Sequence, residues 1–282
     1  MWAIIGGTGF EKFEGFKTIE ELDRNTPFGQ TSHGFKRVSL EGEDVLFIPR
    51  HGTAHDKLPT EVNFRANIFA LKKLGATKLL GFSAVGSLAQ ECEPGSLVIP
   101  EQFIDRTKGI RKVSFCGDGI VGHTSLAEPV SASLVSALKE LCGEFSFKTH
   151  FGKTLVVMEG PNFSTKAESN LYRSWGGDII GMTSYPEFAL AREAGLAYMN
   201  CCFVTDYDCW KDDVPHVTVE EVMRVMKENN KRAFFVAKAM VHCKKESVVK
   251  ACEKAAGLGS ALMTPMDSMT SEQQEWLKVL LK

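Results

Sequence analysis

The chain has 282 residues, of which 44% are apolar and 24% are charged, and its formal net charge is -2. These values are typical of a folded globular protein, and they exclude the basic surplus that nucleic acids and anionic membranes attract. We therefore expect no nucleic-acid partner and no membrane partner. We also expect a cytoplasmic protein, because the sequence has no basic leader with a signal core and no apolar run long enough to span a membrane.

Short apolar runs of strand length recur along the chain. In order they are WAII, DVLFIP, KLLGFSA, SLVIP, TLVVM, DIIGM and YMNCCFV. Segments with helical spacing lie between several of these runs, a pattern typical of a largely parallel sheet that is covered on both faces. No repeat or linker divides the sequence. We predict a single α/β domain over residues 1–282, with a mixed, largely parallel central sheet flanked by helices and a helical tail from about residue 245 to 282.

Local signals mark one hairpin and several helix ends. The stretch FKRVSLEGEDVLFIP alternates on both sides of a polar turn, which predicts a β-hairpin and makes the sheet mixed. Two pairs are spaced as capping boxes, and a first-turn proline precedes a terminal glycine. The two capping boxes are Thr165 with Glu168 and Thr218 with Glu221, and the proline and glycine are Pro186 and Gly195.

Small, polar and charged residues follow six of the predicted strands. They occupy 6–9, 50–52, 83–87, 159–161, 182–184 and 205–208. Because ligands of open α/β sheets bind outside the carboxyl ends of strands, we predict one shared pocket there. Ordinary turns contain the same small residues, but they require neither Arg50 nor Asp206.

The first of these segments, GGTG, is compatible with a dinucleotide, a free phosphate ion or a simple turn. The dinucleotide fingerprint is incomplete, since Phe10, Glu11 and Lys12 follow Gly9 without the third glycine, and no Gly-Lys-Ser or Gly-Lys-Thr completes a Walker motif. Glycines beside hydroxyl groups can form an anion-binding nest, and Arg50 would supply a planar cationic fork. We therefore expect a phosphate ion.

Asp206 and Asp208 lie two residues apart at the end of a predicted buried strand, so in extended geometry both side chains point to one face. Such a pair can act as a general acid, as a base or as metal ligands, or it can belong to a solvated loop. No histidine or cysteine with zinc-ligand spacing accompanies it, and His51 and His55 lack the glutamate of HExxH. The eight cysteines contain no C-x-x-C pair, so we predict free thiols and no metal.

Ten stretches, taken together and in order, resemble one family. They are IIGGTG, TPFG, RHG, NFRANIFALKKLGA, SAVGSL, PGSLVIPEQFIDRT, HTSLAEP, EGPNFST, GMTSYPE and TDYDCW. From about Ile4 to about Val225 the chain resembles the 5'-methylthioadenosine phosphorylases, within the trimeric purine nucleoside phosphorylases. The resemblance implies that inorganic phosphate, a co-substrate, attacks the anomeric carbon of methylthioadenosine. The products are adenine and 5-methylthioribose 1-phosphate, as in purine and methionine salvage, and no cofactor is needed.

The resemblance also implies roles for individual residues. The positions that match its phosphate site are Thr8, Arg50, His51, Ser83, Ala84 and Thr183. The positions that match its nucleoside site are Met182 at the ribose, Phe163 and Ser164 at the base, Asp206 and Asp208 facing the purine, and Val219, Val222 and Met223 around the methylthio group. His123 matches a histidine that a neighbouring subunit of a homotrimer lends to this pocket.

The chemistry of the reaction agrees with an acid at position 206. Cleavage leaves an electron-rich purine, and an aspartic acid whose pKa is raised by burial can protonate N7. Aspartate favours adenine, whereas asparagine would favour a 6-oxopurine. An apolar wall gains about 1 to 3 kcal/mol from a methylthio group, so some cleavage of adenosine should persist. A phosphorylase of adenosine, inosine or methylthioinosine, a hydrolytic nucleosidase and a non-catalytic nucleotide-binding protein remain alternatives.

Overall fold

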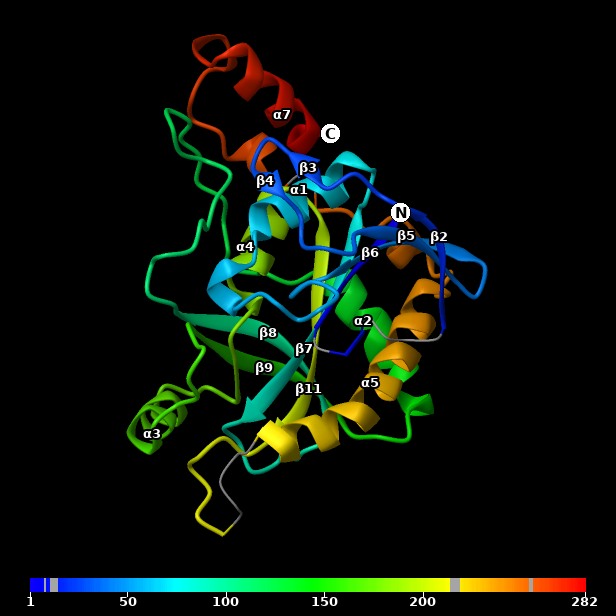
Figure 1. Cartoon of the computed structure of the whole chain (residues 1–282), viewed down its shortest axis with the longest axis vertical. Coiled ribbons are helices and arrows are strands. Elements are labelled where there is room, and N and C mark those ends of the chain that lie inside the picture. Colours follow the sequence, from blue (N-terminus) through cyan, green and yellow to red (C-terminus); the bar gives the residue numbers. More distant parts are fainter. Residues whose placement is uncertain (8, 11–14, 214–218, 254–255) are drawn as a thin grey trace.

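A nine-stranded mixed sheet forms the middle layer of the protein, with helices on both faces (Figure 1). The structure is a computed structural model, and it describes residues 1–7, 9–10, 15–213, 219–253 and 256–282. The strands of the large sheet are β1 (Trp2–Gly6), β2 (Phe16–Glu21), β5 (Lys36–Leu40), β6 (Glu43–Pro49), β7 (Lys78–Ser87), β8 (Leu97–Arg106), β9 (Thr149–Met158), β10 (Ile179–Gly181) and β11 (Ala197–Asp206). The short strands β3 (Asn25–Thr26) and β4 (Gly29–Gln30) pair separately. The helices are α1 (Phe64–Lys73), α2 (Ala132–Leu141), α3 (Lys166–Ser174), α4 (Ser184–Glu193), α5 (Val219–Val241), α6 (Glu246–Val249) and α7 (Ser271–Leu281).

The sheet contains both parallel and antiparallel strand pairs. It runs β10-β9-β8-β11-β7-β1-β6-β5-β2, and β1 pairs in parallel with both β6 and β7. Strand β10 pairs in parallel with β9 and also antiparallel with β7, so that half of the sheet closes on itself. The carboxyl ends of β1, β6, β10 and β11 consequently surround the long strand β7, to which β11 is paired in parallel.

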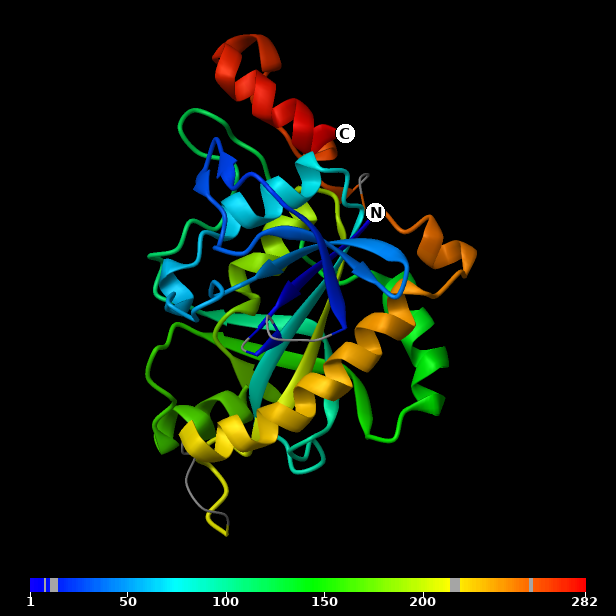
Figure 2. The same ribbon diagram turned by 45° about the vertical axis from the view of Figure 1, so that its right-hand side comes forward.

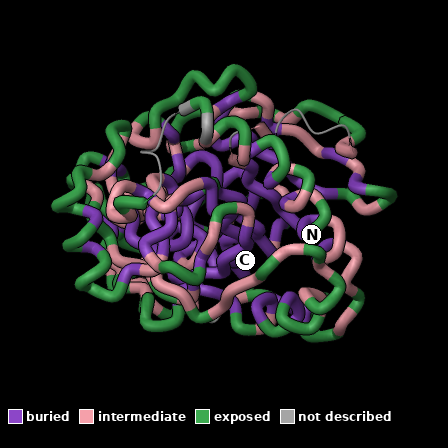
Figure 3. The backbone as a smooth tube through the Cα atoms, turned by 90° about the horizontal axis from the view of Figure 1, so that it is seen from below, coloured by how far each residue is buried: buried purple, intermediate pink, exposed green. Residues whose placement is uncertain are grey.

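Successive side chains of the buried strands point to opposite faces of the sheet and pack into two hydrophobic layers. In β1, Trp2 and Ile4 belong to one cluster together with buried residues of α2 and α5. Ala3 and Ile5 belong to the other, together with buried residues of α1, α4 and α7. This two-sided burial is the reason that the strand sequences are continuously apolar. Figure 2 shows α5 lying across one face of the sheet, and Figure 3 shows buried residues gathered at the centre of the molecule.

The predicted strands and most of the predicted helix ends are confirmed. Each of the seven apolar runs contains a strand, and FKRVSLEGEDVLFIP forms the antiparallel hairpin β5–β6. Glu41 and Gly42 close that hairpin with φ values of 49° and 97°, the left-handed geometry that short hairpin turns require. Pro186 lies in the first turn of α4, and Gly195, with φ 64°, follows its end.

One capping box can be verified directly. Thr165 caps α3, its hydroxyl accepting from the Glu168 N–H at 3.2 Å while the Glu168 carboxylate accepts from the Thr165 N–H at 2.8 Å. Thr218 lies outside the described residues, so the second capping box stays a prediction. The exposed edge strand β2 was not predicted, because its sequence FKTIEE has little apolar content.

The amphipathic end of the chain is the helix α7, which packs on the layer that contains α1. Trp276, Leu277 and Leu280 are buried, and the Trp276 ring meets Phe28 edge-on with 5.1 Å between ring centroids. Among the described residues, no helix has both the length and the apolar character needed to cross a membrane. All eight cysteines are free thiols, as predicted.

Candidate active site

A cavity of about 440 Å³ opens at the carboxyl ends of the strands. Its described lining comes from Gly7, 50–51, 55–59, 83–86, Met158, Pro161, Phe163, 180–183, Thr205, Asp206, Asp208, Val222 and Met226. All six predicted strand-end segments therefore contribute to one cavity, and Arg50 and Asp206 both line it. The expectation about 83–87 is wrong in one respect: these residues do not follow a strand but lie within β7, which continues past β1 because it also pairs with β11 and β10.

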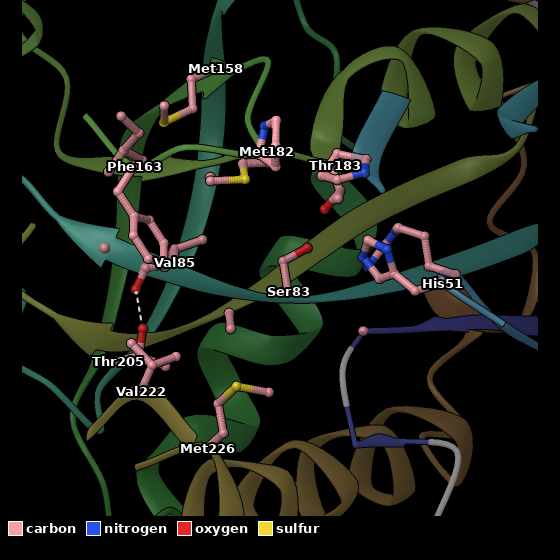
Figure 4. Close-up of a pocket in the computed structure, with 18 of the residues that line it drawn as sticks. His51, Ser83, Val85, Met158, Phe163, Met182, Thr183, Thr205, Val222 and Met226 are labelled. Atoms are coloured by element: carbon pink, nitrogen blue, oxygen red, sulfur yellow. Dashed lines mark hydrogen bonds between the residues drawn. The ribbon is translucent and has the colours of Figure 1, made fainter. Parts of the chain in front are cut away.

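Donors and small residues gather at one end of the cavity. Figure 4 shows His51, Ser83 and Thr183 close together there, and Gly7 lines the same wall. The His51 Nδ1–H donates to the Lys57 carbonyl at 2.8 Å, which leaves Nε2 as an acceptor. Burial, assisted by the Arg50 charge, lowers the pKa of His51 to about 4. The ring is therefore neutral at pH 7, and it can receive a hydrogen bond from a protonated oxyanion.

Arg50 differs from the free cationic fork that we expected. Its Nε and Nη2 donate to the two carboxylate oxygens of Glu187 at 2.7 and 2.9 Å, and its Nη1 donates to the Phe82 carbonyl at 2.8 Å. Both side chains are buried, so the charge of Arg50 must be paired inside the protein. The remaining Nη hydrogens of Arg50 are the ones that can face the cavity, and only they can donate hydrogen bonds to a ligand.

Glu187 and Tyr198 support this site from behind its lining, and the sequence reasoning missed them. The Tyr198 hydroxyl donates to Glu187 Oε1 at 3.0 Å, so the carboxylate holds both the arginine and the tyrosine. A signal was available, because Glu187 stands in the apolar helix segment YPEFALA, where a buried acid needs a cationic partner. The sequence did not indicate which cation that would be.

Two acids line the cavity beside Thr205, which Figure 4 shows across the cavity from His51. Asp206 is the last residue of β11, and its carboxylate accepts from the Thr205 hydroxyl at 2.6 Å and from the Asp208 N–H at 2.8 Å. Burial raises the pKa of Asp206 above its ordinary value, while these two hydrogen bonds oppose the shift. Burial raises the pKa of Asp208 as well. A carboxylic acid in this position can therefore retain a proton closer to neutral pH and donate it into the cavity.

The extended geometry that we expected between the two acids does not occur. The pairing of β11 with β7 shifts register between Val204 and Asp206, and Asp208 has a left-handed backbone with φ 52°. Aspartate is one of the residues that tolerate this conformation. The bulge and the turn, not strand alternation, bring both carboxylates to the same cavity.

The apolar wall on α5 differs from the expected one by a single helical step. Val222 lines the cavity, but Met223 is 52% exposed and lies outside its lining. Met226 takes that place because it lies one turn after Val222, on the same face of the helix. A helical face read from Val222 in steps of four residues would have found it. The side chain of Val219 lies outside the described part of the structure.

The other predicted residues fall into three groups. Ala84, Phe163 and Met182 line the cavity, with Phe163 half-exposed at its mouth. Ser164 lies behind the lining, where its hydroxyl contacts the Met158 sulfur at 3.7 Å, and His123 is an exposed residue of the loop between β8 and α2. Thr8 lies outside the described residues. Residues 56–59, which the sequence reasoning missed, line the cavity together with His55.

Comparisons with known proteins agree on one family. The Phosphorylase superfamily matches residues 2–242. The chain is 42% identical over 278 residues to the S-methyl-5'-thioadenosine phosphorylase of Geobacter sulfurreducens, covering 99% of this chain and 96% of that protein. A crystal structure of a methylthioadenosine phosphorylase from an antarctic soil metagenomic library matches with a TM-score of 0.87 and 37% identity, over 99% of this chain and 98% of that one. The methylthioadenosine phosphorylase of Schistosoma mansoni in complex with adenine matches with a TM-score of 0.82 and 32% identity, over 93% and 98% of the two chains.

Proposed function

This chain belongs to the phosphorylase superfamily, and we propose that it is a pentosyltransferase that cleaves 5'-methylthioadenosine with inorganic phosphate. The products are adenine and 5-methylthioribose 1-phosphate. The observation that carries this proposal is the shared cavity, which has oxyanion-binding groups at one end and a buried acid at the other. Relatives and solved structures that are named as methylthioadenosine phosphorylases support the choice of nucleoside.

In this mechanism each end of the cavity acts on one side of the scissile bond. Ser83, Thr183 and the Gly7 backbone hold phosphate below the anomeric carbon, where its negative charge stabilises an oxocarbenium-like ribosyl group. His51 and the Nη hydrogens of Arg50 complete this end. Asp206 donates a proton to N7 of the leaving purine, and Thr205 and the Asp208 N–H fix the orientation of its carboxyl group.

The first experiment measures adenine released from methylthioadenosine with and without phosphate. The proposal requires release that depends on phosphate and yields a sugar phosphate. Equal release in phosphate-free buffer would identify a hydrolytic nucleosidase instead. Faster release of hypoxanthine from inosine or methylthioinosine would contradict the adenine preference that we assign to Asp206.

We propose in addition that the enzyme acts as a cytoplasmic homotrimer in purine and methionine salvage, without metal or cofactor. Apolar side chains on and beside the loop that carries His123 support a subunit contact, because Ile110, Val121 and Met263 are exposed by 68%, 49% and 68%. Light scattering of the purified protein measures the subunit number. A monomer with full activity would contradict this part of the proposal.

The methionines of α5 allow a test of the methylthio subsite. We expect Met226→Ala to lower kcat/KM for methylthioadenosine by about 10- to 100-fold, because dispersion and hydrophobic contact with the methylthio group are lost. Cleavage of adenosine, which has a 5'-hydroxyl, should fall less. Met223→Ala is the matched control, since its side chain is half-exposed and outside the cavity. The assignment of Met223 to the methylthio group would be restored if Met223→Ala changes the ratio of kcat/KM for methylthioadenosine to kcat/KM for adenosine and Met226→Ala does not.

A further inference from the structure

Arg111 is a buried arginine on the loop between β8 and α2, and the proposed mechanism does not use it. Its side chain is 1% exposed, and its Nε donates to Glu159 Oε1 at 2.6 Å. The second carboxylate oxygen of Glu159 accepts from the Lys108 N–H at 2.5 Å. The pair therefore fastens the base of this loop to the segment that follows β9.

The other donors of Arg111 bind three backbone carbonyls, two in a different segment and one at Glu159 itself. Nη1 donates to the Met182 carbonyl at 2.8 Å and to the Tyr185 carbonyl at 2.6 Å, and Nη2 donates to the Glu159 carbonyl at 2.9 Å. The two Nη1 bonds are made on either side of Thr183 and fix the backbone that carries it. A planar guanidinium group can make all these bonds at once, whereas an ammonium group is a single point of charge.

The two segments that Arg111 joins form neighbouring parts of the cavity wall, because β10 pairs with β9 and Met182 packs closely against Gly160. Met158, Pro161 and Phe163 line it from the segment around Glu159, and Met182 and Thr183 line it from the other. The described lining includes neither Arg111 nor Glu159, so both act from behind the wall. Without the Arg111 side chain, the segment around Glu159 and the Met182–Thr183 segment would lose these hydrogen bonds and could move relative to each other.

We propose that Arg111 is a positioning residue, which sets the distance between the base-side wall at 158–163 and the Met182–Thr183 segment. The inference rests on the proposed function, since its effect is measured on phosphorolysis. Reaction rates are sensitive to small displacements of the groups that orient substrates, and a shift of about 1 Å can reduce the rate about 100-fold. Arg111 thereby contributes to catalysis without touching either substrate.

The test is chemical rescue of Arg111→Ala. We expect kcat/KM for methylthioadenosine to fall about 100-fold, and millimolar guanidinium chloride to restore part of it by filling the vacated space. Sodium chloride at equal concentration should not restore activity. This readout separates positioning from folding, because guanidinium weakens a variant that is merely destabilised. Arg192→Ala is the matched control: it removes a partly buried arginine that pairs with Glu253 at 3.2 Å and does not line the cavity, and its kcat/KM should stay near that of the wild type.

Each outcome has a defined meaning. A folded Arg111→Ala variant with wild-type kcat/KM, or one that guanidinium does not rescue, overturns the inference. If Arg111→Ala does not fold, Arg111→Lys carries the test, because lysine keeps the charge beside Glu159 but cannot span both segments. Wild-type kcat/KM in Arg111→Lys would then overturn it. If the wild-type enzyme itself releases no adenine with phosphate, the proposed function has failed and not the role of Arg111.

Discussion

Asp206→Ala is expected to lower kcat/KM for release of adenine from methylthioadenosine by about 10²- to 10⁴-fold, the contribution of a positioned general acid. The side chain that would protonate N7 is lost, while the residues at the phosphate end keep their contacts. Circular dichroism verifies that the variant is folded, and initial rates at saturating phosphate give the effect. Asp44→Asn, an exposed acid on the β5–β6 hairpin, is the control and should retain the wild-type rate.

The pH dependence of the same residue gives a second readout. Because burial raises the pKa of Asp206, its acid form persists above the pH at which an exposed aspartate ionises. The reaction needs this proton, so kcat/KM should fall as the pH rises through the raised pKa. Asp206→Asn should lose this descending limb and should favour 6-oxopurines, since its amide donates a hydrogen bond without transferring a proton. An unchanged pH profile in Asp206→Asn would assign the proton to another group.

Glu187→Ala is expected to lower the free energy of unfolding by about 3 to 5 kcal/mol, because it leaves the buried Arg50 charge without its partner. Urea unfolding followed by fluorescence measures the change. Glu187→Gln should be less damaging, since the amide oxygen still accepts from Arg50, although the opposite charge is lost. Glu20→Gln at the partly exposed Glu20–Arg37 pair, 3.1 Å apart, serves as control and should change stability by only about 0 to 1 kcal/mol.

The result for Glu187 also distinguishes two explanations of the pair. If Glu187→Ala and Glu20→Gln lower the free energy of unfolding by the same amount, the Arg50 charge must be compensated by water or by the Phe82 carbonyl. If Glu187→Ala unfolds the protein but phosphate restores its stability, the ligand supplies the missing negative charge. The second outcome would support a direct contact between Arg50 and phosphate.

The parts of the fold that follow from local patterns could be predicted from the sequence. Strands that are covered by helices on both faces need apolar residues at every position. The sequences of β1 and β11 are therefore recognisable as strands even when the neighbouring strands are unknown. The convergence of Arg50 and Asp206 follows from a general rule for parallel sheets, and it needs no knowledge of side-chain contacts, whereas Ser83 reaches the cavity from within β7. Family resemblance then supplied the chemistry of the cavity.

The parts that depend on long-range partners could not be predicted. Arg50 and Glu187 are 137 residues apart, and nothing in either local sequence specifies the other. The same holds for Arg111, whose partners lie in two distant segments. Met223 was chosen instead of Met226 because the family resemblance matches positions along the chain and does not show which side of a helix faces the cavity. The side of α5 that faces the cavity is determined by how the helix packs on β11. The backbone at Asp208 turns left-handed, a departure from strand alternation that residue spacing does not reveal.

The course of α5 has a thermodynamic consequence for the two substrates. Asn229 anchors the helix to the end of β11 by donating to the Val204 carbonyl at 2.9 Å, and Asn230 lies so close to Gly9 that a Cβ added there would clash with its Nδ2. The same helix thus contacts the glycine turn near its middle and carries Val222 in its first turn. A ligand that shifts this helix at one of these contacts alters the affinity for the ligand at the other, and linkage makes the two reciprocal factors equal. Calorimetric titration of each substrate analogue in the presence of the other would reveal this cooperativity as a single coupling constant.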